Sequence, residues 1–213
     1  MRVHQRIIIV LLGAAFALAL CACGETAVSD GTTFALNRDG SVTQTIIGTN
    51  EDRIGKNDLT SFVEQQVAAY NPGGGDPPVV LRSCDIDGNR ISIELHYASI
   101  DDYAAFNHVP AFEGDVEEAL TKGFLFGSRF LTNSGLEYSG YTIPVEYPEM
   151  RVLVLQEPMN VVIPEKAVLY SDNMKKNEDG SFTISDSDVS GIPDIFQTIN
   201  IEPSYIVYKA SEN

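Results

Sequence analysis

The fold of this chain is inferred most directly from VVLRSCDIDGNRISIELHY, residues 79–97. Its second half, Arg90–Tyr97, alternates polar and apolar side chains without a break, which is the pattern of a strand with one buried face. Its first half, Val79–Ile86, is rich in residues that favour strands, and Asp87-Gly88-Asn89 lies between the two halves. Because Gly readily adopts the positive φ that a tight turn needs, the stretch predicts an antiparallel hairpin.

Two other Asp-Gly pairs lie next to β-rich segments. Asp39-Gly40 separates Thr32–Leu36 from Val42–Ile47, and Asp179-Gly180 precedes Phe182–Ile184. The remaining candidate strands lie further along the chain and are Phe124–Thr132, Glu137–Ile143, Arg151–Gln156, Asn160–Ile163, Lys166–Tyr170 and Ser204–Lys209. The chain contains no heptad run or low-complexity tract, and we expect no internal repeat.

The clearest helical pattern covers Asp58–Tyr70. Its apolar residues recur at three- and four-residue spacing, with Gln66 as the single polar interruption. Asn57 or Asp58 can cap the first turn, and Asn71-Pro72 ends the helix. We expect this apolar face to belong to the core and not to a binding site.

Two short helices are expected after the central hairpin. One begins after a cap at Ser99, the other begins at Asp115, and Gly123 ends the second. Strands outnumber helices, and several strands are joined by tight turns. The sequence therefore predicts an α+β fold, with a largely antiparallel sheet built from Asp-Gly hairpins, one longer amphipathic helix and two short helices.

The first residues have the parts of an export signal. Arg2 and Arg6 give a basic start, and Ile7–Leu20 is an apolar run that only Gly13 interrupts. At about 1.5 Å per residue the run makes about 21 Å of helix, shorter than a hydrocarbon core of about 30 Å. The following residues, Leu20-Cys21-Ala22-Cys23-Gly24, resemble the lipobox of bacterial lipoproteins, and the chain is similar to small surface lipoproteins of the Gram-positive type.

The resemblance implies a diacylglycerol on a cysteine thiol and cleavage just before that cysteine. Cys23 is the expected site because the small Ala22 precedes it, whereas Cys21 follows the bulky Leu20 and is the alternative. Lipid chains on Cys23 would hold the protein on the extracytoplasmic face of the cell membrane. A plain secretory signal and a short N-terminal anchor helix are the other interpretations of these residues.

This interpretation divides the chain into three parts. Residues 1–22 are the signal peptide, residues 23–31 a lipid-anchored tether and residues 32–213 a single α+β domain, with a weak subdivision near 144–150. The opening of that domain, Phe34–Tyr70, is similar to the start of uncharacterised membrane-associated lipoprotein domains.

The charge of the chain limits its partners. Lys and Arg number 14 and Asp and Glu number 30, so the formal net charge is −16 at pH 7. Removal of the leader takes away Arg2 and Arg6 and no acidic residue, which makes the remaining chain more acidic still. Nucleic acid and anionic lipid head groups are therefore not expected partners.

The sequence gives only weak evidence for a metal site. Asp85, Asp87 and Asn89 have the alternate spacing of a calcium loop, but the glycine and the distal glutamate are misplaced for an EF-hand. We expect no cofactor, and no catalytic residue stands out. Cys84 lies in a predicted strand, where a buried, small apolar side chain is its expected role.

Tyr138, Tyr141 and Tyr147 lie in a loop-like stretch and are the candidate recognition surface. The alternative is that their rings pack over one end of the sheet. We expect a membrane-anchored, non-catalytic binding or interaction domain, whose partner is an envelope protein or a small molecule. A small-ligand or metal receptor and a cell-envelope hydrolase are the alternative functions.

Overall fold

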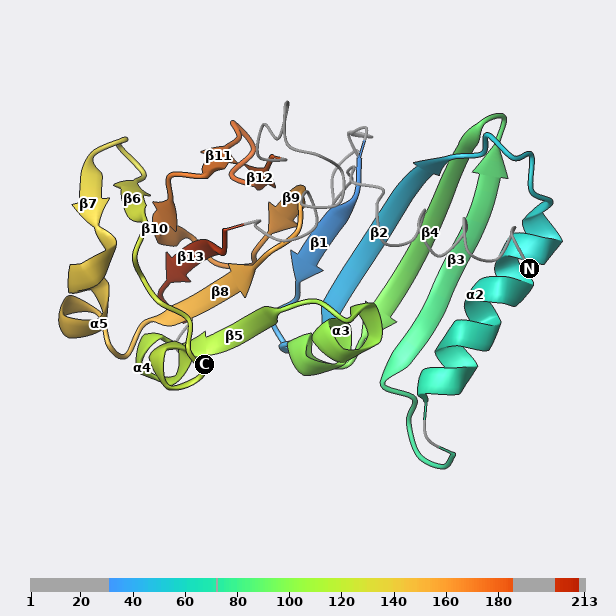
Figure 1. The fold of residues 1–213 in the computed structure, drawn as a ribbon, viewed down its shortest axis with the longest axis horizontal. Coiled ribbons are helices and arrows are strands. Elements are labelled where there is room, and N and C mark those ends of the chain that lie inside the picture. The colour runs from blue at the N-terminus through green and yellow to red at the C-terminus, as the bar shows by residue number, and fades with distance from the viewer. Residues whose placement is uncertain (1–30, 72, 186–201, 211–213) are drawn as a thin grey trace, which may run out of the picture. The chain divides into compact units, whose positions relative to one another are not determined.

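The computed structural model describes residues 31–71, 73–185 and 202–210 (Figure 1). These residues form two compact units. The first comprises the described residues up to His108 together with Met159–Val162, and the second comprises Val109–Pro158 and the described residues from Ile163 onward. That residues 32–213 fold as a single domain stays a prediction.

The sheet of the first unit contains the predicted central hairpin. Its strands are β1 (Thr33–Leu36), β2 (Val42–Thr49), β3 (Val79–Asp87), β4 (Arg90–Tyr97) and β9 (Met159–Val162), and they lie side by side in the order β9-β1-β2-β4-β3. Asp87 pairs with Arg90 across the tight turn, where Gly88 has a φ of 57°. Only the β1–β9 pair, among those described for this unit, runs parallel.

Two helices, α2 (Lys56–Tyr70) and α3 (Ile100–Asn107), pack against this sheet, and α2 lies along β3 (Figure 1). Helix α2 buries Leu59 and Val63 against the strands. It begins two residues earlier than predicted, and its cap, Gly55, has no side chain, so the predicted capping by Asn57 or Asp58 is wrong. The predicted cap of α3 is confirmed, because the Ser99 hydroxyl accepts from the N–H of Asp102 at 3.1 Å.

The second unit is an antiparallel sheet with a hydrophobic core and two short helices. Its sheet contains β5 (Ala111–Asp115), β6 (Arg129–Thr132), β7 (Glu137–Ser139), β8 (Arg151–Leu155), β10 (Ala167–Ser171) and β13 (Ser204–Tyr208), in the order β5-β8-β13-β10-β6-β7. The helices are α4 (Val116–Thr121) and α5 (Ile143–Glu146), with a 3₁₀ turn at Gly140–Thr142. Phe112, Phe130 and Tyr205 are among the largest side chains of its core. The strands β11 (Met174–Lys176) and β12 (Phe182–Ile184) form an antiparallel hairpin.

The predicted fold class is wrong in detail, although the protein is α+β. The described residues contain two sheets, not one, and four α-helices, not three. Helix α5 and the 3₁₀ turn replace the end of the predicted strand Glu137–Ile143. Strand β7 ends at Ser139, and at Gly140 the chain lies so close to the carbonyl oxygens of Phe126 and Ser128 that a Cβ would clash with them. Pro144 then favours the first turn of a helix.

The structure also contains a repeat that we did not expect from the sequence. Residues 37–43 read NRDGSVT and residues 177–183 read NEDGSFT. In both turns the Asn amide donates to the Ser and Thr hydroxyls, and the Ser hydroxyl donates to the Asp carboxylate. The pairing registers agree, since Leu36 lies opposite Val42 and Lys176 lies opposite Phe182.

Candidate functional site

A groove opens in the first unit between α2, α3 and the sheet. Its volume is about 480 Å³, which is within the range of small-molecule sites. The side chains along it are mostly apolar, with a few polar groups among them. They are Ile46, Phe62, Val63, Gln66, Ala69, Tyr70, Leu95, Ala105, Phe106, Asn107 and His108.

Helical spacing brings the α2 side of the groove together. Phe62 and Gln66 are four residues apart, and Ala69 and Tyr70 follow one turn later, so all four project from one side of the helix. Ala69 on α2 and Ala105 on α3 both line the groove, and both side chains are small and exposed. The predicted apolar face of α2 is buried at Leu59 and Val63 and only partly buried in its second half, where Gln66 is exposed.

An aromatic cluster supports the α3 side of the groove. The ring of Phe106 meets Tyr70 edge to face, with centroids 5.6 Å apart, and it meets Tyr97 at 5.8 Å. Tyr97 also packs edge to face against Tyr103 at 5.3 Å. Tyr97 and Tyr103 are fully buried, so the ring of Phe106 packs against the core of the unit.

Hydrogen bonds fix the polar groups beside these rings. The Tyr97 hydroxyl donates to Gln44 Oε1 at 2.7 Å and accepts from Asn107 Nδ2 at 3.2 Å. Asn107 Nδ2 also donates to the Tyr103 carbonyl at 2.9 Å. The Tyr70 hydroxyl donates to Asp102 Oδ1 at 3.2 Å. Desolvation raises the pKa of the Tyr70 hydroxyl, and the negative charges of Asp102 and Asp101 raise it further.

The candidate calcium ligands lie at the end of the β3–β4 hairpin. Asp85 forms an ion pair with Lys56 at 2.5 Å, and both side chains are mainly exposed to solvent. The Asn89 carbonyl accepts a hydrogen bond from the N–H of Asn50 at 2.7 Å. In the part of the chain that the structure describes, no three His, Cys, Asp or Glu side chains gather closely enough to hold a metal ion.

The three candidate tyrosines of the second unit lie in different surroundings. Tyr138 and Tyr147 pack against the core, and their ring centroids are 5.9 Å apart. Tyr141 is 78% exposed. The structure thus places two of these rings over the core and one in solvent, and a recognition role stays a prediction.

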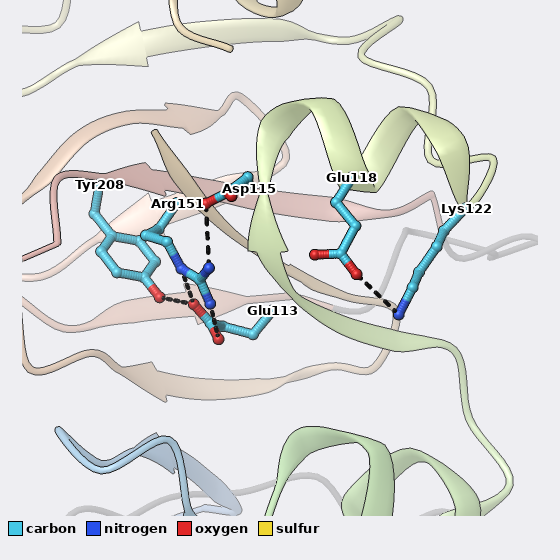
Figure 2. Close-up of polar contacts among 6 residues, drawn as sticks. All are labelled: Glu113, Asp115, Glu118, Lys122, Arg151 and Tyr208. Atoms are coloured by element: carbon cyan, nitrogen blue, oxygen red, sulfur yellow. Dashed lines mark hydrogen bonds and ion pairs between the residues drawn. The ribbon is translucent and has the colours of Figure 1, made fainter. Parts of the chain in front are cut away.

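A polar cluster of the second unit surrounds Arg151, as Figure 2 shows. Arg151 donates to both oxygens of Glu113, at 2.8 and 2.6 Å, and to Asp115 at 3.1 Å. The Tyr208 hydroxyl donates to Glu113 Oε1 at 2.5 Å. Nearby on α4, Lys122 pairs with Glu118 at 3.5 Å.

This Arg151 cluster is best explained as a tie between strands. Hydrogen bonding to Glu113 raises the pKa of Arg151, and desolvation raises that of Tyr208. Both oxygens of Glu113 are engaged by partners on β8 and β13, so this carboxylate is held in place and not presented to a substrate. The cluster joins three adjacent strands of the sheet.

The lipidation candidates Cys23 and Cys21 lie outside the described residues. Cys84 is 7% exposed, which confirms its predicted burial. Among residues 31–71, 73–185 and 202–210, no helix has both the length and the apolar character needed to cross a membrane.

The groove was not predicted from the sequence, although Gln66 was identified as the polar interruption of the helix face. A polar residue in the middle of an apolar helix face was the available signal. Its significance depends on α3, which packs beside α2 only in the folded unit. Comparison of the chain with protein-family models, with curated proteins and with solved structures gives no match.

Proposed function

We propose that this protein is a lipid-anchored, extracytoplasmic binding protein whose first unit holds a small, largely apolar ligand in the groove between α2 and α3. The observation that carries the binding part is the groove itself. Apolar walls with a few fixed polar groups, in a space of about 480 Å³, are typical of small-molecule sites.

The construction of the groove supports a site that is formed before its ligand arrives. Tyr97 and Tyr103 fix the aromatic side, and Asn107 is held through two donated hydrogen bonds. A ligand that enters such a groove buries its apolar surface, and no free energy is needed to order the side chains of the walls. This arrangement favours binding over a purely structural use of the two helices.

The anchoring part of the proposal is supported by the leader alone. Lipidation at Cys23 would place the groove outside the cell, where it can meet solutes of the envelope. Replacement of Cys23 by Ala should abolish incorporation of a labelled fatty acid into the full chain, while Cys21→Ala should leave it unchanged. The reverse result would move the anchor to Cys21, and labelling of the double variant Cys21→Ala/Cys23→Ala would contradict a lipid anchor at either position.

The binding part is tested by filling the groove. Ala69→Trp places a large ring over the apolar floor, whereas Ala68→Trp changes the neighbouring exposed position of α2, which does not line the groove. The full-length protein in detergent is screened by thermal unfolding against panels of sugars, amino acids, aliphatic acids and amines. A ligand at 100 times its dissociation constant stabilises the fold by about 2.7 kcal/mol.

The comparison between the two Trp variants gives the result. We expect at least one compound to stabilise the wild type and the Ala68→Trp variant but not the Ala69→Trp variant. Equal stabilisation of both variants would show that binding occurs elsewhere. A wild type that no compound stabilises would contradict the proposal for these ligand classes.

A further inference from the structure

The charges around the groove between α2 and α3 discriminate between ligands. Among the described residues that line the groove there is no Lys or Arg, and His108 is the single residue with a basic side chain. Asp101 and Asp102 lie in the first turn of α3, and both act electrostatically on the Tyr70 hydroxyl at the groove wall. The whole chain has a formal net charge of −16. An anion would therefore enter against a negative potential, and a cation would be attracted.

The hydrogen-bonding groups of the wall give the same preference. Both N–H groups of the Asn107 amide are donated within the protein, so this side chain can offer a ligand only its Oδ1 acceptor. The Tyr70 hydroxyl donates its proton to Asp102 and can offer only a lone pair. Two fixed groups thus present acceptors, which suit a ligand that donates hydrogen bonds.

Aromatic rings complete this pattern. Phe62, Tyr70 and Phe106 contribute three rings to the lining. The face of an aromatic ring is electronegative and attracts a cation within about 6 Å of its centre. Rings also cover apolar parts of a ligand, so they accommodate a molecule that combines a positive group with a hydrocarbon body.

From these three observations we infer that the groove binds an organic ammonium ion with an apolar body. The ammonium group donates to Asn107 Oδ1 and the Tyr70 oxygen, with Asp102 behind the tyrosine, and the hydrocarbon body lies against Ile46 and Leu95. This inference rests on the proposed function, because it names the class of ligand for the same groove.

Three probes of nearly equal shape test which charge on a ligand the groove prefers. Phenethylammonium, phenethyl alcohol and phenylpropanoate share the aromatic body and differ in the head group. Their affinities are measured by NMR titration of the full-length protein in detergent. We expect the ammonium ion to bind about tenfold more tightly than the alcohol, and the carboxylate to bind most weakly.

The outcomes separate this inference from the proposed function. If the alcohol binds as tightly as the ammonium ion, and Ala69→Trp abolishes both, the groove is a ligand site but the preference for ammonium is wrong. If the carboxylate binds most tightly, the inference is likewise overturned. If none of the three binds, the ammonium inference fails, and the wider panel described above decides about the groove.

Substitution of the acidic residues supplies a second test. Asp102→Asn should weaken binding of phenethylammonium about threefold or more and leave phenethyl alcohol unchanged. Since Asp102 also bonds to Ser99 at the start of α3, Asp101→Asn serves as a variant outside that contact and should show a smaller effect of the same sign. Asp87→Asn is the matched control, because Asp87 lies at the turn end of β3, opposite Arg90, and Tyr97 lies at the other end of the hairpin. Equal weakening by Asp87→Asn would overturn the assignment of the charge effect to α3.

Discussion

The β1–β2 and β11–β12 hairpins share a turn and differ in their strands. In each turn the Ser hydroxyl lies 2.6 Å from the Asp carboxylate, and the glycine has a φ of 83° in one and 89° in the other. Yet β2 has eight residues, whereas β12 has three. The five shared residues of the seven-residue turn reproduce its geometry. The paired part is similar in length, from Thr33 to Leu36 in one hairpin and from Met174 to Lys176 in the other, and β2 is longer because it also pairs with β4 along its whole length.

The difference is clearest at the residue three positions before each turn asparagine. Phe34 is fully buried and packs edge to face on Tyr103, with ring centroids 5.0 Å apart. The equivalent residue in β11 is Met174, which is 6% exposed. A turn motif therefore specifies how two strands are joined, while the side chains beyond the turn specify what the hairpin contributes to stability.

Truncation of these two side chains should give the largest difference between the hairpins. Phe34→Ala should lower the free energy of unfolding by about 3–5 kcal/mol, and Met174→Ala by about 2 kcal/mol, because the aromatic ring leaves the larger cavity. Hydrogen exchange of the strand amides, measured in the full-length protein, reports each hairpin separately. A Met174→Ala effect equal to or above that of Phe34→Ala would contradict the comparison.

Removal of the turn asparagine should have a smaller effect that still differs between the hairpins. Asn37→Ala removes the amide donor to the hydroxyls of Ser41 and Thr43, and Asn177→Ala removes the donor to those of Ser181 and Thr183. Because Ser41 is buried and Ser181 is only half-buried, we expect a loss of about 2 kcal/mol in the first case and about 1 kcal/mol in the second. Chemical denaturation of both variants checks this, and equal losses would show that burial of the serine is immaterial.

Substitution of the turn glycine should affect the two hairpins equally. Gly40→Ala and Gly180→Ala should each cost about 1 kcal/mol, because both residues have positive φ and no atom lies close enough to clash with a new Cβ. Gly73→Ala is the control, since that glycine also has free space but no positive φ. A cost at only one of the two turns would mean that their backbones are not equivalent in solution.

The smallest expected effect is the response of the turns to acid. The Ser41 hydroxyl and N–H lower the pKa of Asp39 from 3.8, and Ser181 does the same for Asp179. Since the folded pKa lies below the unfolded one, this contribution is fully present above about pH 4 and is lost as the pH falls through the folded pKa. Both carboxylates are largely exposed, so solvent and salt keep the effect small.

Thermal unfolding at pH 6 and at pH 3, about one unit below the ordinary value for aspartate, reveals this response. The double variant Asp39→Asn/Asp179→Asn should lose less stability between these two values than the wild type does. A variant with the same acid sensitivity as the wild type would assign that sensitivity to other carboxylates.

Local patterns predicted more of the fold than of the groove. The alternation in β4, the cap at Ser99 and the stop at Gly123 depend on neighbours in sequence, and all three are confirmed. Strand β11 was missed because Met174–Lys176 is short and mostly polar. Strand β5, Ala111–Asp115, was missed because it lies directly between two helices and carries little alternation.

The groove could not be predicted in the same way. It is lined from both helices, with Ala69 of α2 and Ala105 of α3 among its residues. Nothing in either helix alone shows that the other will pack beside it. The repeated turn is a different case, since residues 37–43 and 177–183 were open to direct comparison in the sequence.

The position of β13 has a consequence for the order in which the second unit can be completed. Ser204–Tyr208 lies in the middle of the sheet, between β8 and β10, although it is the last strand of the described chain. A ribosome or an export channel releases the chain from its N-terminus, so β5 and β8 emerge early, as do β6, β7 and β10, and each group then exposes an unpaired strand edge. The sheet closes only when the last strand arrives, and Tyr208 then contacts Glu113. The order β5-β8 and β10-β6-β7 is thus joined into one sheet only by the last described strand, and a chain that ends before Ser204 leaves facing edges of β8 and β10 unpaired.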